Sequence, residues 1–198
     1  MNAQELAVLV ASGESLAIEF KSDRGPLPDA ELVEAVCCLA NGQGGTLLIG
    51  VEDDGRITGL HARHQTAAQA LAALIANRTV PPIMVSSEFV MIDGVNVAVV
   101  TVPASSQPIS TSDGRLLTRY LDMRGAPGCR PLYAHELTSW RADRMLVDPS
   151  ALPVPGTSWD DLDSLEFNRV RRMVTENRGD NALLELTDEE IARALGLI

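Results

Sequence analysis

The sequence predicts an α+β fold, in which a mixed β-sheet is flanked by helices. Alternating apolar and charged residues at 18–21 predict a strand that buries one face. The nearly continuous apolar run at 46–51 is typical of a central strand that is covered on both faces. Asp93-Gly94 separates two segments rich in β-forming residues, about 84–92 and 95–102, and favours a hairpin turn between them. Segments with helical spacing lie between these strands, so we expect helices and strands to share one domain.

Most of the predicted helices have a start or stop signal. Gly13 suits the position after the first helix, Asp29 can cap the second, and Pro81 prevents the third from continuing. Leu137 and Trp140 lie on the apolar side of the fourth. The predicted helices cover residues 3–11, 30–40, 65–77 and 133–145, and two further short strands are expected at 56–60 and 115–124.

The chain is expected to divide into one complete domain and the beginning of another. Residues 1–146 form the predicted α+β domain, and 147–160 hold three prolines and a glycine, as linkers often do. Residues 161–198 have helical spacing and a capping box at Thr187–Glu190, so they predict the start of a helical domain. Because the sequence stops on an apolar helix end, we expect this short C-terminal segment to be truncated.

Composition narrows the classes of function and the cell compartment. No run of about 18 uncharged apolar residues exists, so no membrane partner is expected. The N-terminus has no secretory signal pattern. Three cysteines form an odd set, with Cys37 and Cys38 adjacent in a helical segment, which favours reduced, buried thiols in a cytoplasmic protein.

Charge is unevenly distributed along the chain. The net charge of −11 opposes non-specific nucleic-acid binding, which depends on neutralising phosphates. Residues 151–198 are strongly acidic, whereas 115–144 carry six arginines against three acidic residues. This imbalance predicts a basic face on an acidic molecule.

Acidic side chains near the first two predicted strands suggest a metal site. Glu14 and Glu19 approach the first strand, and Glu52 and Asp53 follow the second. Carboxylates that converge from neighbouring strands can bind Mg²⁺ or Mn²⁺, and Lys21 could assist as a catalytic residue beside them. The alternative is a solvated strand face with a Glu–Lys pair and an acidic turn, which spacing alone favours.

The arginines of the basic segment are the best candidates for phosphate contacts, because guanidinium groups bind phosphate bidentately. Tyr120 and Tyr133 lie among them and could stack on unpaired bases. The alternative, an ordinary exposed surface with internal ion pairs, is equally compatible with the sequence. His61 and His64 are interpreted as surface residues near a turn, since a zinc site would need more ligands. The candidate arginines are Arg115, Arg119, Arg124, Arg130, Arg141 and Arg144.

Taken together, the motifs over Glu14–Leu60 resemble the Schlafen/AlbA-type domain. They comprise an E-x-x-x-x-E-F-K entry, a helix ending in A-N-G-x-G-G, the strand L-L-I-G-V-E-D-D-G and the segment I-T-G-L. A looser similarity extends to Trp140 through R-Y-L-D-M-R-G and Y-A-H-E-L. The resemblance implies an α+β fold that contacts nucleic acid.

The resemblance also implies roles for the acidic residues. In Schlafen nucleases, which act on structured RNA such as transfer RNA, two glutamates and a later acidic residue form the catalytic metal site. The matching positions here are Glu14, Glu19 and Glu52, with Asp53 as the alternative third. Two departures are the acidic charge of the whole chain and the presence of a single such domain without convincing zinc ligands.

Three functions are therefore expected, in order of preference. The first is a nucleic-acid-binding N-terminal module of a bacterial transcriptional regulator, in which Lys21 and the candidate arginines contact phosphates of DNA or RNA. The second is a metal-dependent endoribonuclease, whose only expected cofactor is Mg²⁺ or Mn²⁺. The third is a module for oligomerisation, such as a homo-oligomer, or for ligand sensing.

Overall fold

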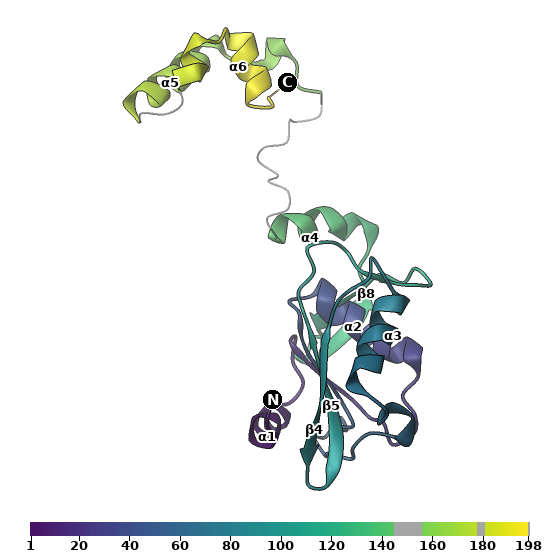
Figure 1. The fold of residues 1–198 in the computed structure, drawn as a ribbon. Helices are drawn as coiled ribbons and strands as arrows, with labels where there is room; N and C mark the ends of the chain where they lie inside the picture. Colours follow the sequence, from purple (N-terminus) through teal and green to yellow (C-terminus); the bar gives the residue numbers. More distant parts are fainter. Residues whose placement is uncertain (145–155, 178–180, 198) are drawn as a thin grey trace. The chain divides into compact units, whose positions relative to one another are not determined.

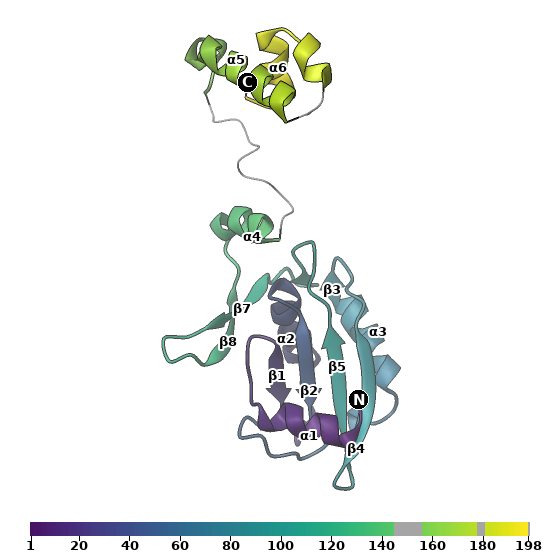
Figure 2. The ribbon, with the colours of Figure 1, turned by 90° about the vertical axis from the view of Figure 1, so that its left-hand side faces the viewer.

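The main sheet of the protein is mixed and has four strands in the order β1-β2-β5-β4; Figure 1 shows the β4–β5 hairpin, and Figure 2 shows all four strands. The computed structural model describes residues 1–144, 156–177 and 181–197. Strand β1 (Ile18–Lys21) pairs in parallel with β2 (Gly45–Ile49). Strands β5 (Val95–Val102) and β4 (Ser86–Ile92) complete the sheet through antiparallel pairs. The predicted α+β class, the central strand and the hairpin at Asp93-Gly94 are confirmed.

Helices cover both faces of this sheet. Helices α2 (Asp29–Asn41) and α3 (Ala68–Arg78) pack on one face, and α1 (Ala3–Ala11) lies across the other (Figure 2). Neighbouring residues of β2 pack into two different hydrophobic cores. Leu47 packs into the core on the α2 side of the sheet, and Leu48 packs into the core on the α1 side. The central strand is therefore apolar throughout, because both of its faces are buried.

A glycine is required where β2 begins beside β1. A Cβ atom on Gly45 would lie 2.1 Å from the carbonyl oxygen of Ala17, and the residue has a φ of +147°. Only glycine has no Cβ to clash with that carbonyl, and it adopts positive φ readily. The turn after α2 thus brings β2 into register by a close approach of two backbones.

Two small sheets extend the domain. Strands β3 (Thr79–Val80) and β6 (Ser110–Thr111) form one, and β7 (Leu117–Leu121) and β8 (Pro127–Pro131) form an antiparallel hairpin. In Figure 2 this hairpin lies on the β1 side of the main sheet, with its turn pointing away. The predicted strand at 115–124 is shorter than expected, and β8 was not predicted because two prolines and a glycine disfavour strand structure.

Two other sequence predictions need correction. The expected strand at 56–60 is reduced to an isolated bridge between Val51 and Ile57. The expected helix at 133–145 is divided into a 3₁₀ turn (Ala134–Glu136) and α4 (Leu137–Asp143). A further 3₁₀ turn, Ala62–His64, precedes α3.

The C-terminal part of the described chain is helical. It contains α5 (Ser164–Glu176) and α6 (Asp188–Ala194), which share a small core around Phe167 and Ile191. Two 3₁₀ turns, Trp159–Asp161 and Asn181–Glu185, complete it. The predicted capping box is present, since Thr187 and Glu190 each bond the other's backbone N–H.

The chain divides into two compact units, Met1–Leu137 and Thr138–Ile198. The domain boundary expected at 146 and most of the linker expected at 147–160 lie outside the described residues. Within the described ranges, no helix has the length and apolar character needed to cross a membrane.

Candidate functional site

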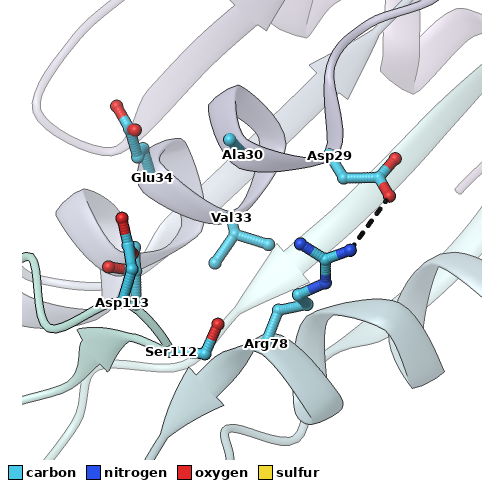
Figure 3. Close-up of a pocket in the computed structure, with 8 residues that line it drawn as sticks. Asp29, Ala30, Val33, Glu34, Arg78, Ser112 and Asp113 are labelled. Atoms are coloured by element: carbon cyan, nitrogen blue, oxygen red, sulfur yellow. Dashed lines mark ion pairs between the residues drawn. The ribbon is translucent and has the colours of Figure 1, made fainter.

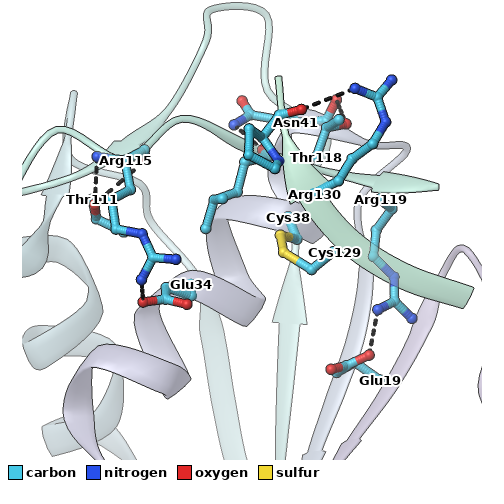
Figure 4. The surroundings of a disulfide bond; sticks show 12 residues. Glu19, Glu34, Cys38, Asn41, Thr111, Arg115, Thr118, Arg119, Cys129 and Arg130 are labelled. Carbon is cyan, nitrogen blue, oxygen red and sulfur yellow. Dashed lines mark hydrogen bonds and ion pairs between the residues drawn. A yellow bond between two sulfur atoms is a disulfide. The ribbon is translucent and has the colours of Figure 1, made fainter. Parts of the chain in front are cut away.

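Glu19 and Lys21 lie on one face of the edge strand β1, but both are engaged in ion pairs. The Lys21 Nζ is 2.6 Å from a carboxylate oxygen of Glu19. The other oxygen of Glu19 binds the guanidinium of Arg119 from β7 (Figure 4). Only 10% of the Glu19 side chain is exposed. Two cations therefore occupy this carboxylate, as expected for a buried charge that must be compensated.

Glu14 joins the same cluster from the loop before β1. Its Oε1 accepts a hydrogen bond of 2.9 Å from the backbone N–H of Phe20. Burial raises the pKa of Glu14, the charge of Glu19 adds to this shift, and the Phe20 N–H opposes it. The structure thus brings Glu14, Glu19 and Lys21 together and adds Arg119 to them.

Glu52 and Asp53 are placed differently. Glu52 accepts hydrogen bonds from Thr58 Oγ1 at 2.6 Å and Ser22 Oγ at 2.9 Å, and these bonds, led by that from Thr58, lower its pKa. Asp53 lies exposed in the following turn. Within the described residues, no three His, Cys, Asp or Glu side chains are placed to hold a metal ion. The donor set does not fit Mg²⁺ or Mn²⁺ as it is arranged, so the metal site stays a prediction.

Three of the candidate arginines form internal ion pairs. Arg115 binds Glu34 of α2, Arg119 binds Glu19, and Arg130 binds both carboxylate oxygens of Glu136. The Arg119 guanidinium also donates to the carbonyls of Ser15 and Ile18, at 2.6 and 3.0 Å. With 3% of its side chain exposed, Arg119 is too buried to reach a phosphate, although its Nε has no hydrogen-bond partner within the described residues; its role here is to attach β7 to β1.

The β7–β8 hairpin nevertheless exposes aromatic and cationic groups together. We call Tyr120, Arg124, Arg130 and Tyr133 the hairpin surface. The two tyrosines are 37% and 52% exposed. The Glu136 carboxylate raises the pKa of Arg130. The Arg130 guanidinium lies 5.9 Å from the centre of the Tyr133 ring, and the register puts Arg130 on the same face of the hairpin as Tyr120. Arg124, at the exposed turn, has no side-chain hydrogen bond or ion pair within the described chain.

Tyr120 lies flat along the hairpin because its partner across the ladder is a glycine. Gly128 pairs with Tyr120, and a Cβ at Gly128 would be 2.8 Å from the tyrosine Cε1. Residues directly opposite in an antiparallel pair point to the same face. The register therefore places Tyr120 and Arg130 on one face and Arg119 and Cys129 on the other.

The remaining two candidate arginines belong to the second unit. Arg141 is exposed near the end of α4. The Arg144 guanidinium lies 3.8 Å from the centre of the Trp140 ring, and burial lowers its pKa. They are not part of the hairpin surface.

The Arg130–Glu136 pair predicts an acid-labile contact. The hydrogen bonds from Arg130, followed by the Tyr133 N–H, lower the pKa of Glu136 from 4.5 to about 2. A depressed carboxyl pKa stabilises the fold above the unfolded value and loses this contribution as the pH falls towards 2. We expect carboxyl NMR to give a Glu136 midpoint near pH 2 in the wild type and a higher midpoint in Arg130→Gln. An unchanged midpoint in the variant would contradict this assignment.

Cys38 and Cys129 form a disulfide, which corrects the expectation that all three thiols are reduced. Their Cα atoms are 5.9 Å apart although 91 residues separate them in sequence. The bond joins α2 to β8, an element that the sequence did not predict, so the pairing could not be foreseen. Cys37 is free and buried, as expected, and desolvation raises its pKa to about 12.

A buried aspartate, which was not among the predicted site residues, binds groups of both histidines. Asp23 is fully buried and accepts from the backbone N–H groups of Leu27 and His61, at 2.8 and 2.7 Å. His64 Nδ1 lies 3.0 Å from both oxygens of this carboxylate. The interpretation of His64 as a surface residue is therefore wrong, because its side chain is mostly buried against Asp23.

A polar cavity of about 190 Å³ lies beside α2 but does not suit phosphate. Figure 3 shows its lining by Asp29, Glu34 and Asp113 together with Arg78, which is 3.7 Å from Asp29. Three carboxylates against one guanidinium make its lining acidic. An acidic cavity repels phosphate, so it does not belong to a nucleic-acid interface.

The chain is similar to known proteins in its sequence and in its fold. The chain is similar over 98% of its length to the DIP2311 protein of Corynebacterium diphtheriae, with 24% identity and a TM-score of 0.55, and it spans 36% of that protein. It is also similar over 56% of its length to the N-terminal domain of a RecG-related protein from Nitrosomonas europaea, with 25% identity and a TM-score of 0.46, covering 80% of that domain. The Schlafen AlbA_2 family matches residues 14–125, more than half of the chain. The protein therefore belongs to the Schlafen AlbA_2 family, as its sequence motifs predicted.

Proposed function

We propose that the unit Met1–Leu137 binds unpaired nucleic acid through the hairpin surface. The observation that carries this proposal is the placement of Arg130 beside the exposed Tyr133 ring and on the same face of the hairpin as the exposed Tyr120. Tyrosine faces stack on unpaired bases, and arginine adds phosphate and cation–π contacts. Membership of the Schlafen AlbA_2 family supports nucleic-acid contact by this unit in general. In this proposal the unit is the nucleic-acid-binding module of a bacterial transcriptional regulator.

The ion pairs favour unpaired strands over duplexes as the ligand. Arg115 and Arg119 are committed to Glu34 and Glu19, and Lys21 is committed to Glu19 as well. Few cations remain for phosphates on a chain of net charge −11, so electrostatic attraction to a duplex is weak. Stacking depends on exposed base faces and supplies roughly 1–3 kcal/mol per base, which makes it the larger contribution here.

Substitutions on the hairpin surface test this proposal. Tyr120→Ala or Tyr133→Ala should each weaken binding of a labelled single strand about five- to hundred-fold, from the loss of one stacked base. Tyr120→Phe should retain most of the affinity, because the ring remains. Arg124→Ala should reduce the magnitude of the salt slope of the wild type, which we expect to be about −1 since only one or two phosphates are contacted.

Fluorescence anisotropy with single-stranded DNA, single-stranded RNA and a duplex of the same sequence provides these measurements. Arg63→Ala is the matched control, since Arg63 is also exposed but pairs with Asp29 outside the hairpin. A preference for the duplex, or unchanged binding by both tyrosine variants, would contradict the proposal.

A second candidate, metal-dependent RNA cleavage, is motivated by the cluster of Glu14, Glu19 and Lys21. Because the carboxylates do not assemble a metal-binding group, we derive no catalytic step from them. Incubation of transfer RNA with Mn²⁺ or EDTA, using wild type and the Glu14→Gln/Glu19→Gln double variant, separates the two functions. Cleavage that needs Mn²⁺ and is lost in the variant would support a nuclease, whereas binding that survives EDTA supports the first proposal.

A further inference from the structure

Strand β8 is an outer strand that pairs with β7 alone in the sheets of the described chain. Its sequence is Pro-Gly-Cys-Arg-Pro, and each residue faces one residue of β7. Pro127 and Pro131 have no N–H to donate, but they face Leu121 and Leu117 between the bonded pairs of the ladder, since Asp122 bonds Ala126 and Leu132 bonds Leu116. Gly128 loses more conformational freedom on folding than any other residue type. A strand of this composition needs additional attachment in order to stay in register.

Strand β7, in contrast, is fixed to the core by buried polar groups. The Asn41 side chain, at the end of α2, donates to the carbonyl of Leu117 at 2.8 Å. Thr118 Oγ1 lies 3.4 Å from the carbonyl of Asn41, and Arg119 binds Glu19 on β1. These contacts do not involve the disulfide, so β7 should keep its position when that bond opens.

The disulfide attaches β8 covalently to the core of the domain. It joins the middle residue of β8, Cys129, to Cys38 of α2 (Figure 4). Cys38 is fully buried, whereas Cys129 is an exposed residue, so the bond is closer to solvent on the β8 side. The high pKa of Cys37 keeps it in the unreactive thiol form, so it should not take part in exchange.

We propose that the Cys38–Cys129 disulfide is a redox-operated latch that fixes β8 and thereby sets the affinity of the hairpin surface; this regulation rests on the function proposed above. A small thiolate attacks Cys129 Sγ and forms a mixed disulfide, while Cys38 leaves as a thiolate and takes a proton from water. A second thiolate attacks the small-molecule sulfur, so Cys129 leaves and is protonated. Two external thiols are oxidised to one disulfide, and the protein gains two electrons and two protons.

The direction of the effect follows from where the binding residues lie. Arg130 is on β8 and Tyr133 follows it, whereas Tyr120 is on the fixed strand β7. Opening the latch releases Arg130 and Tyr133 from Tyr120, so binding must then also order β8. Because preorganised groups bind more tightly, the oxidised protein is the high-affinity form.

The latch can be tested without nucleic acid. Hydrogen exchange of the full chain, oxidised or treated with dithiothreitol, should show about tenfold or greater loss of protection in β8 on reduction, as for a local opening, with the amides of β2 unchanged. Cys129→Ser should behave like the reduced protein with or without dithiothreitol. Cys37→Ser should behave like the wild type, since Cys37 is not in the bond. Equal β8 protection in both redox states, or alkylation of all three cysteines after air oxidation, would overturn the latch.

Binding of the labelled single strand then distinguishes the two proposals. Oxidised wild type should bind about tenfold more tightly than reduced wild type or Cys129→Ser, the gain expected from preorganisation. Equal binding by both redox states overturns the latch but leaves the proposed function in place. A redox-dependent change in β8 protection with no binding in either state contradicts the proposed function and reduces the latch to a structural device without a role in binding.

Discussion

Replacing Arg119 with alanine should destabilise the protein by about 3–5 kcal/mol, the cost of leaving a buried charge without its partner. The substitution removes the guanidinium from the Glu19 carboxylate and also leaves the carbonyls of Ser15 and Ile18 without this donor. Lys21 still compensates part of the Glu19 charge, which favours the lower end of this range. Urea denaturation of purified wild type and variant measures the difference.

Arg124→Ala is the matched control for this experiment. Arg124 is in the same hairpin but is exposed and has no side-chain partner within the described residues, so its loss should change stability by no more than about 0.5 kcal/mol. Arg119→Lys should recover only part of the loss, since an ammonium cannot reproduce the fork of donors. Equal effects of the two alanine substitutions would show that the Arg119 network does not hold β7 in place.

Asn41→Ala should have a comparable effect, about 3 kcal/mol or more, because it leaves several buried backbone groups without partners. Asn41 is almost fully buried, and its amide connects the end of α2 to two distant segments. Its Nδ2 donates to the carbonyls of Ile109 and Leu117, at 2.6 and 2.8 Å, and its Oδ1 accepts from the Ile109 N–H at 2.8 Å.

Thermal and chemical denaturation of Asn41→Ala should be compared with Asn77→Ala, which removes an exposed asparagine from α3. The control should be neutral or slightly stabilising, since alanine favours helix formation. Because Asn41 attaches Leu117, the variant should also loosen β7, which hydrogen exchange of the β7 amides would detect. Unchanged protection of β7 would show that Arg119 alone holds the strand.

The sequence was sufficient to predict the elements whose periodicity reflects burial. The β2 segment is apolar at successive positions because Leu47 and Leu48 enter opposite cores, and this pattern is visible in the sequence. The Asp93-Gly94 hairpin has a local turn signal of the same clarity. Strand β8 has neither kind of signal, since its prolines and glycine resemble those of a loop.

Long-range ion pairs were the main obstacle to predicting the site. Arg119 looks like a phosphate contact in the sequence, because its partner Glu19 is 100 residues away. The same separation hides the role of Glu19, which then resembles a free metal ligand. The buried roles of Asp23 and Asn41 could not be predicted, because a single polar residue forms no periodic sequence pattern and its bonding partners are distant in the chain. Charge counts along a chain therefore overestimate the cations that are available to a ligand.

The close approach of the Gly45 and Ala17 backbones limits what can be inferred from the family match of this protein. The glycines after α2 are part of the sequence motif that resembles the family, and at Gly45 the backbone carbonyl of Ala17 leaves no room for a side chain. Selection on folding alone would keep such a glycine. A match to the family at this position therefore reports how β2 enters the sheet, and it does not by itself assign a chemistry to the chain.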